Sequence, residues 1–293
     1  MVIPLGTCLT AGVICLLVMG SVLAPANADE QSPAKASAPV VRVLPAEGMP
    51  DAVPCTVYPP APLPKGKKAG LVIHLYGRGG SHTDYNMLHP AFDDVRRLLA
   101  ERGYYLVVPE LGTDHWMNDK AVRTLDAIIK GMVASGAVDP KRVSILGTSM
   151  GGGSGLAYVI QRPRVIHSIC AVFPMTDFAV WVKEQPHYAN SIAGGHGVAI
   201  ADLPPVLAKL SVLQHLDAFA KVPVFLVHGG ADTTVPTHHS TDFAAALQKK
   251  GFKVTYREAP GIGHDDNAAM KFQAEIADFL TDQKPKNDKA KGK

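Results

Sequence analysis

The sequence predicts an α/β fold in which a mostly parallel sheet of about eight strands carries helices on both faces. Short apolar runs rich in β-branched residues recur along the chain, and most are separated by segments whose apolar residues have helical spacing. Strands that are apolar on both faces and alternate with helices are typical of a parallel sheet covered on both sides. We therefore expect one α/β domain with a buried sheet.

Six apolar runs are expected to be strands of this sheet, and three apolar stripes are expected to be helices. The strand runs are residues 71–76, 105–108, 143–146, 169–173, 224–227 and 253–256. The helical stripes lie within residues 92–99, 125–132 and 272–280. Ligands of such sheets bind at the carboxyl ends of the strands. Polar residues that directly follow a strand are therefore the candidate site residues.

The composition is that of a globular chain with a sizeable core. Of the 293 residues, 47% are apolar and 19% are charged, which excludes the collagen-like, disordered and disulfide-dense classes. The formal net charge is +3, but residues 283–293 hold five lysines against one aspartate, so the rest of the chain is slightly acidic. Without a basic face to neutralise phosphates, this body is not expected to bind nucleic acid.

The N-terminus has the pattern of a secretory signal. Residues 1–28 contain no charged side chain, and an apolar run over residues 11–23 is followed by Ala26-Asn27-Ala28, an A-x-A cleavage pattern. This run is shorter than the roughly 20 residues of a membrane span, although an uncleaved anchor is the alternative. We expect cleavage after Ala28, a periplasmic or secreted protein, and no stable membrane span in the mature chain.

The mature chain is expected to contain a linker, one domain and a tail. Residues 29–39 have the composition of a flexible linker, residues 40–282 form the α/β domain, and residues 283–293 form a lysine-rich flexible tail. The alternative for the tail is a tether to an anionic surface. Cys55 and Cys170 could pair in an oxidising compartment. Their positions, in a short edge segment and in a sheet run, favour two separate buried thiols.

The strongest functional motif follows the strand run 143–146 and reads Gly147-Thr148-Ser149-Met150-Gly151-Gly152. A strand, small residues and a helix that can start near Met150 are the strand-turn-helix of a nucleophile elbow. A Cβ at Gly147 or Gly151 is expected to clash in so sharp a turn. Ser149 is then expected above the sheet, at a helix N-terminus that favours a developing oxyanion. The alternative is a Gly-Ser helix cap without chemistry.

A serine hydroxyl is a weak nucleophile, so a histidine must take its proton and a carboxylate must orient that histidine. Asp232 lies in the loop after the strand run 224–227, and His264 lies on a glycine-flanked loop after the last strand. The chain order Ser149, Asp232, His264 agrees with the order expected for this architecture. Asp177 is the rival acid and His228 the rival base.

These motifs resemble those of the α/β-hydrolase superfamily, over residues 71–280. The segment His228–Pro236 and the doubled glycine after Ser149 are most similar to dienelactone-hydrolase-like and prolyl-oligopeptidase-type catalytic domains. The resemblance implies that Ser149 is the nucleophile, Asp232 the orienting acid and His264 the general base. It also implies an oxyanion hole, whose backbone N–H groups belong to Tyr76, within His74-Leu75-Tyr76-Gly77, and to Met150.

The motifs and the resemblance together predict a serine hydrolase that cleaves carboxylic esters of small molecules through an acyl-enzyme on Ser149. We expect no cofactor. We also expect no metal, because the 12 histidines include no His-x-x-x-His pair and the adjacent His238 and His239 are not expected to face one ion.

Two alternative functions stay open. A prolyl-oligopeptidase-type peptidase fits the same motifs, but the short stretch between the linker and Leu71 leaves no room for a gating domain. A non-catalytic binding protein on the same fold is the other alternative. The oligomeric state is not predicted.

Residues 176–221 are the lid candidate, because they lie between two strand runs at the position where hydrolases of this type commonly carry a lid. The alternative is a plain helical connection. Trp181 in this segment and Trp116, which follows the strand run 105–108, are candidate substrate-pocket residues, because tryptophan offers a large rigid apolar surface. For Trp116 the alternative is an anchor in the core.

Overall fold

The structure is a computed structural model, and it describes residues 40–44, 53–84 and 90–282. The expected signal peptide (1–28), linker (29–39) and lysine-rich tail (283–293) lie outside the described residues. The described ranges run from the first strand of the sheet to the last helix.

An eight-stranded sheet in the order β1-β2-β4-β3-β5-β6-β7-β8 forms the centre of the described structure. Neighbouring strands from β4 to β8 are parallel, whereas β2 is antiparallel to both β1 and β4. The strands are Val40–Leu44 (β1), Val53–Tyr58 (β2), Ala69–Leu75 (β3), Tyr104–Pro109 (β4), Val138–Thr148 (β5), Ser168–Val172 (β6), Val224–Gly229 (β7) and Val254–Ala259 (β8). The predicted fold class is confirmed, and each of the six strand runs falls in a strand of this sheet.

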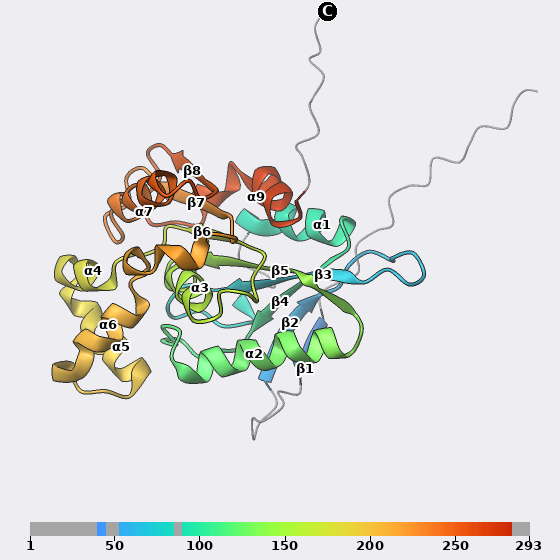
Figure 1. Ribbon diagram of the computed structural model, residues 1–293, viewed down its shortest axis with the longest axis horizontal. Coiled ribbons are helices and arrows are strands. Elements are labelled where there is room, and N and C mark those ends of the chain that lie inside the picture. The colour runs from blue at the N-terminus through green and yellow to red at the C-terminus, as the bar shows by residue number, and fades with distance from the viewer. Residues whose placement is uncertain (1–39, 45–52, 85–89, 283–293) are drawn as a thin grey trace, which may run out of the picture. The chain divides into compact units, whose positions relative to one another are not determined.

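Helices cover both faces of the sheet (Figure 1). α1 and α9 contact each other on one face, and α2 and α3 lie on the other. The helices are Asp93–Glu101 (α1), Asp119–Ala134 (α2), Met150–Gln161 (α3), Phe178–Glu184 (α4), Ala189–His196 (α5), Leu203–Leu210 (α6), His238–Lys249 (α7), Asn267–Met270 (α8) and Gln273–Leu280 (α9). The predicted helical stripes fall in α1, α2 and α9. Within these ranges, no helix combines the length and the apolar character needed to cross a bilayer.

The two cysteines expected in the mature chain lie in different strands. Cys55 is in β2, which the sequence placed at the edge of the sheet; β1 instead pairs along the outer side of β2 and forms that edge. Cys170 is in β6, and both thiols are buried and free, as expected. Burial raises the pKa of Cys55 to about 12, so its thiol is protonated and unreactive at neutral pH.

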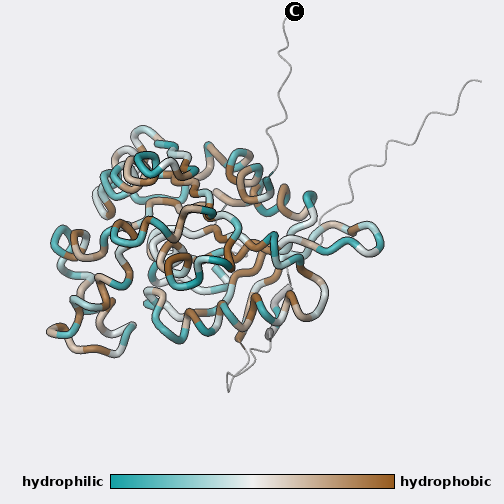
Figure 2. The backbone as a smooth tube through the Cα atoms, in the orientation of Figure 1, coloured by the Kyte–Doolittle hydropathy of each residue, from teal (hydrophilic) through white to brown (hydrophobic). Residues whose placement is uncertain are grey.

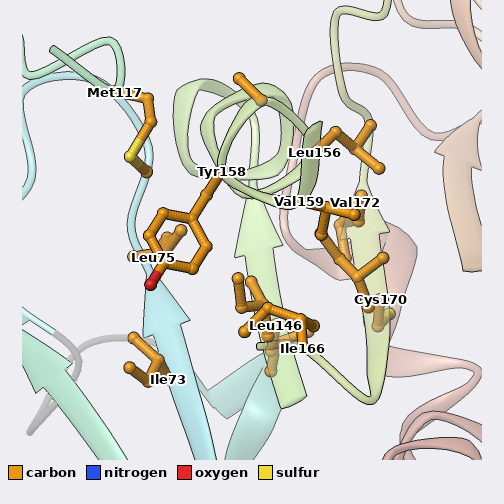
Figure 3. Packing of buried hydrophobic residues seen from close by; sticks show 14 of the residues in the cluster. Ile73, Leu75, Met117, Leu146, Leu156, Tyr158, Val159, Ile166, Cys170 and Val172 are labelled. Atoms are coloured by element: carbon orange, nitrogen blue, oxygen red, sulfur yellow. The ribbon is translucent and has the colours of Figure 1, made fainter. Parts of the chain in front are cut away.

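Helix α3 packs directly on the centre of the sheet. Figure 3 shows Leu156, Tyr158 and Val159 of this helix close to Leu146 of β5 and Cys170 of β6, all of them fully buried. Burying each large aliphatic side chain stabilises the fold by about 1.5–3 kcal/mol. Figure 2 shows that apolar residues gather in the central strands and that polar residues lie on the outer turns of the helices.

A sharp turn at the end of β5 places Ser149 at the N-terminus of α3. Ser149 has φ 52° and ψ −119°, a conformation that residues with a side chain rarely adopt. Its N–H donates to the Val172 carbonyl of β6 at 2.9 Å. A Cβ at Gly147 would overlap the Gly151 carbonyl, and a Cβ at Gly151 would overlap the Leu75 carbonyl of β3. The turn therefore requires both glycines.

A helical insertion between β6 and β7 contains the lid candidate, residues 176–221. Helices α4, α5 and α6 alternate there with short 3-10 turns at Pro186–Tyr188, Ile200–Asp202, Val212–Gln214 and Leu216–Phe219. In Figure 1 these three helices project beyond one end of the sheet. The insertion starts directly after β6, so it begins beside the turn that carries Ser149.

We expect Gly151→Ala to destabilise the fold strongly, because a Cβ there overlaps backbone atoms of β3 that cannot move independently. The loss of unfolding free energy should be about 3 kcal/mol or more, the upper range for overpacking, as measured by urea unfolding. Gly194→Ala in α5 is the control: no atom lies within 4 Å of its added Cβ, so helix propensity should stabilise it by up to about 1 kcal/mol. Equal unfolding midpoints for the two variants would contradict the steric account of the turn.

Candidate active site

Three of the predicted site residues form a continuous hydrogen-bonded row. Ser149 Oγ lies 2.8 Å from Nε2 of His264, and Nδ1 of His264 lies 2.7 Å from Oδ2 of Asp232. The three residues come from the turn after β5, the loop after β8 and the loop after β7. With its proton on Nδ1, the imidazole donates to the carboxylate and presents Nε2 to the hydroxyl as an acceptor. This geometry can remove a proton from the serine.

The loops that carry the acid and the histidine are joined through their backbones. The N–H of Ala231 donates to the Ile262 carbonyl at 2.8 Å. A Cβ at Gly229 would overlap the Gly263 carbonyl, so a side chain at the end of β7 would push the two loops apart. The close approach of these backbones therefore fixes the separation of the carboxylate and the imidazole.

Asp232 is the buried charge of the site. Its side chain has no exposed surface, and its second oxygen accepts the N–H groups of Thr234 and Val235, each at 2.9 Å. Burial alone raises the pKa of Asp232, but hydrogen bonds from His228 and His264 outweigh that effect and hold the pKa well below its ordinary value. The carboxylate is therefore ionised at neutral pH.

Neither the rival acid nor the rival base is hydrogen-bonded to Ser149 in the described part of the chain. His228 is fully buried beside Asp232: its Nε2 lies 2.8 Å from the Val235 carbonyl and 3.4 Å from Oδ2 of Asp232, and its Nδ1 lies 2.7 Å from the Ser240 hydroxyl. Asp177 caps α4, because its side chain accepts the N–H groups of Ala179 and Val180 at the start of that helix. The imidazole and the carboxylate in the row with Ser149 are thus those of His264 and Asp232.

Ser149 and His264 open onto a pocket of about 300 Å³. Its other lining residues include the rings of Phe173 and Tyr188 and the charged side chains of Arg78, Asp84 and Asp266. The ring of Phe173 packs 4.4 Å from the imidazole of His264, measured between ring centres, which restricts rotation of that imidazole. The volume lies at the low end for ligand pockets and suits one small group.

Tyr76 and Met150 were predicted to supply oxyanion N–H groups. Met150 is the first residue of α3, where N–H groups have no acceptor within the helix. Tyr76 lines the pocket, and its phenol oxygen accepts the N–H of Leu111 at 2.7 Å, which ties the loop after β3 to the loop after β4. A Cβ on Gly77 would lie 3.6 Å from Cβ of Ser149, so this backbone runs beside the serine. The oxyanion role of the two N–H groups stays a prediction.

Trp116 and Trp181 are buried in the packing of the insertion, and neither lines the pocket. Nε1 of Trp116 donates to the Ser191 hydroxyl at 2.8 Å, and Nε1 of Trp181 donates to the Thr234 carbonyl at 2.9 Å. Tyr188 stacks on Trp181 with ring centres 4.5 Å apart, and it does line the pocket. The tryptophans therefore anchor the insertion, and Tyr188 presents an aromatic surface to a ligand.

Arg78 is a charged pocket residue that the sequence analysis did not select. The available signal was its position, directly after Gly77 in the loop beyond the end of β3. Its Nε donates to Asp114 at 2.7 Å and to the Ser191 hydroxyl at 3.1 Å. Ser191 lies 113 positions further along the chain, in the insertion, so no local pattern could reveal this contact.

His238 and His239, at the start of α7, both face Glu184, and one ligand atom from each of the three lies within 4.8 Å of the others. This corrects the expectation that the two adjacent histidines do not face one ion. Their Nε2 atoms lie 2.7 and 3.2 Å from the two oxygens of Glu184, because the rings stack 4.5 Å apart and point the same way. Nδ1 of His239 accepts the N–H of Thr176 at 3.4 Å, so its Nε2 carries the proton that is donated to Glu184. Metal binding at Nε2 would require the other tautomer. The cluster therefore fits a hydrogen-bonded link between α4 and α7 better than a metal site.

Comparison with known protein families shows to which family the chain belongs. Residues 90–285 match the model of the prolyl oligopeptidase family. The chain belongs to the prolyl oligopeptidase family. The matched range contains Ser149, Asp232 and His264, and the resemblance inferred from the motifs is confirmed at the level of the family and of its α/β-hydrolase fold.

Two curated relatives are several times longer than the segment that matches this chain. The chain is 28% identical to an uncharacterized secreted protein of Arthroderma benhamiae over 242 residues, which are 78% of this chain and 24% of that protein. It is 25% identical to acylamino-acid-releasing enzyme 2 of Oryza sativa subsp. japonica, over 72% of this chain and 28% of that protein. The chain thus spans about a quarter of the length of these relatives.

Solved structures of a peptidase and of an esterase share the fold. A puromycin-hydrolyzing peptidase of Mycobacterium tuberculosis superposes with a TM-score of 0.69 at 21% identity, over 84% of this chain and 40% of that one. A ferulic acid esterase superposes with a TM-score of 0.65 at 17% identity, over 83% of this chain and 97% of that one. The two superpositions show the fold. Because both sequence identities are below 25%, they leave the choice between peptide and ester substrates open.

We expect Asp232→Asn to destabilise the protein in a pH-dependent way. Because folding lowers the pKa of Asp232, its ionised form stabilises the fold fully above the unfolded pKa of about 3.9, and this contribution is lost as the pH falls through the lower folded value. The difference in unfolding free energy between wild type and variant should be about 1–3 kcal/mol above pH ~5 and should narrow below pH ~4.

Urea unfolding at a series of pH values measures this difference. Asp217→Asn is the control, because it changes an exposed carboxylate that pairs with Lys250, and its effect should stay small at every pH. A difference for Asp232→Asn that grows on acidification would contradict the assignment of the buried charge.

Proposed function

We propose that the chain is a serine hydrolase that cleaves carboxylic esters of small molecules through an acyl-enzyme on Ser149. The observation that carries this proposal is the row Ser149, His264 and Asp232, with contacts of 2.8 and 2.7 Å, which opens onto a pocket. Membership of the prolyl oligopeptidase family supports the hydrolase class.

In this mechanism Ser149 Oγ attacks the ester carbonyl while its proton moves to Nε2 of His264. Asp232 keeps the proton on Nδ1 and stabilises the imidazolium that forms. The N–H groups of Tyr76 and Met150 donate to the oxyanion of the tetrahedral intermediate, and the N-terminus of α3 favours its negative charge. The imidazolium then protonates the leaving alcohol. A water molecule, deprotonated by the same Nε2, releases the acid and restores the serine.

The size of the pocket supports esters over peptides. Its volume of about 300 Å³ suits one small group better than an extended peptide. A structure described as a ferulic acid esterase also shares the fold, with a TM-score of 0.65. We also propose a periplasmic or secreted location, which the pattern of residues 1–28 and the name of the Arthroderma benhamiae relative support.

A serine peptidase is the second candidate, because the relatives include proteins named as peptidases. The same row of side chains would attack an amide carbonyl. The two reactions differ in the leaving group: an amine must receive a proton from His264 before it departs, whereas an alkoxide or phenoxide depends less on that transfer. Substrates matched in their acyl group therefore separate the two candidates.

We expect Ser149→Ala to lose ester hydrolysis by about ten-thousand-fold or more, because it removes the nucleophile and leaves the pocket intact. A fluorophosphonate probe should label the wild type in the periplasmic or culture-medium fraction and should not label the variant. Ser154→Ala is the matched control, because Ser154 is a buried serine on the same helix that does not line the pocket, and it should keep both activity and labelling. Hydrolysis by Ser149→Ala at the wild-type rate would refute the mechanism.

We expect kcat/KM for a 4-nitrophenyl ester to exceed that for the 4-nitroanilide of the same acyl group by at least about a hundredfold, or about 2.7 kcal/mol of transition-state stabilisation. Release of nitrophenol or nitroaniline measures both rates. Comparable kcat/KM values for the two substrates would favour the peptidase and set aside the esterase.

A further inference from the structure

The guanidinium of Arg78 is held in the wall of the pocket by one residue from a loop and one from a helix. Its Nε donates to Asp114, in the loop after β4, at 2.7 Å and to Ser191, in α5, at 3.1 Å. Burial alone raises the pKa of Asp114, but hydrogen bonds from Ser191 and Arg78 outweigh that effect and hold the pKa below its ordinary value. Asp114 is therefore an ionised partner that orients the arginine.

The two terminal nitrogens of Arg78 form no hydrogen bond with any residue that the structure describes. In the described part of the chain, the contacts of this side chain all involve Nε or the ring of Tyr188. That ring lies 5.6 Å from the guanidinium carbon, measured to its centre, and it also lines the pocket. Stacking and the Nε contacts thus hold a planar group whose end carries four unused N–H donors.

The pocket also contains two carboxylates, which restrict where an anion can bind. Asp84 belongs to the loop after β3, where its carboxylate accepts the N–H of Ser81 at 2.7 Å, and Asp266 precedes α8. Arg78 is held instead by Asp114, in the loop after β4, and by Ser191 and Tyr188 of the insertion. The part of the wall at Arg78 therefore favours an anion, and the part at Asp84 and Asp266 disfavours an anion.

We propose that Arg78 binds a carboxylate of the substrate, so that the preferred esters carry a carboxylate on their acyl or alcohol group. This proposal rests on the serine-hydrolase function proposed above and names its substrate class. The two terminal nitrogens present a fork that matches the two oxygens of a carboxylate. Ser191 and Asp114 act through Arg78 as positioning residues. The ring of Tyr188 lies under the guanidinium, and both residues line the pocket.

The test compares esters that differ in one charge. One pair, 4-acetoxybenzoate and its methyl ester, places the carboxylate on the leaving group; the other pair, mono-4-nitrophenyl adipate and 4-nitrophenyl hexanoate, places it on the acyl group. In at least one pair, the wild type should have the higher kcat/KM for the charged ester. Arg78→Gln should lower the ratio of charged to neutral kcat/KM by about tenfold to a hundredfold, as expected for a charge-assisted hydrogen-bonded pair.

Three further variants sharpen this test. Arg78→Lys keeps the charge without the fork and should lower the ratio less than Arg78→Gln. Asp114→Asn removes the negative charge that pairs with Nε and should lower the ratio through KM for the charged ester. Arg97→Gln is the matched control, because Arg97 is similarly exposed on α1 and pairs with carboxylates of that helix, and it should leave the ratio unchanged.

The outcomes separate this proposal from the proposed function. A wild type that hydrolyses the esters and favours the neutral member of both pairs would overturn the role of Arg78, and so would an Arg78→Gln variant with an unchanged ratio. If the wild type hydrolyses none of the esters, the proposed function fails, and calorimetric titration with adipate and 4-hydroxybenzoate still tests the site. Binding that Arg78→Gln removes would support the carboxylate site, and the absence of binding to the wild type would overturn it.

Discussion

The arrangement of the site depends on one steric constraint, the contact between backbones at the end of β5. Gly147 and Gly151 face carbonyl groups so closely that neither can carry a Cβ, and Ser149 between them has a positive φ. Such a conformation costs about 1–3 kcal/mol, and it persists because the surrounding packing stabilises it. Here the packing of α3 on the central strands supplies that stabilisation. The buried centre of the fold thus holds Ser149 in a strained conformation.

A second constraint is the buried charge of Asp232, which joins three elements. One of its oxygens accepts backbone N–H groups that lead into α7, and the other faces the imidazoles of His228 and His264. An ionised carboxylate without these partners would be costly to bury. The same contacts that satisfy the charge therefore also orient His264 toward Ser149. Stability and geometry depend here on one set of hydrogen bonds.

The sequence could predict the sheet and the three converging side chains, because both follow from local patterns. Apolar runs mark the strands, and the ends of parallel strands meet at one edge, so Ser149, Asp232 and His264 could be placed together before any contact was known. The carboxylate that His238 and His239 share and the support of Arg78 could not be predicted. These contacts depend on which way side chains point across segments that lie far apart in the chain, and residue spacing carries no such information.

The insertion shows why specificity is harder to infer than reaction class. The indole of Trp181 donates to the loop that carries Asp232, and Lys209 on α6 pairs with Asp119 on α2 at 2.9 Å. Tyr188 stacks on Trp181 and faces the pocket, so the aromatic wall could not swing aside without breaking contacts that also support the acid loop. These contacts hold the insertion against the loop of Asp232 and against α2. In this arrangement the shape and charge of Tyr188 and its neighbours determine which groups fit the pocket.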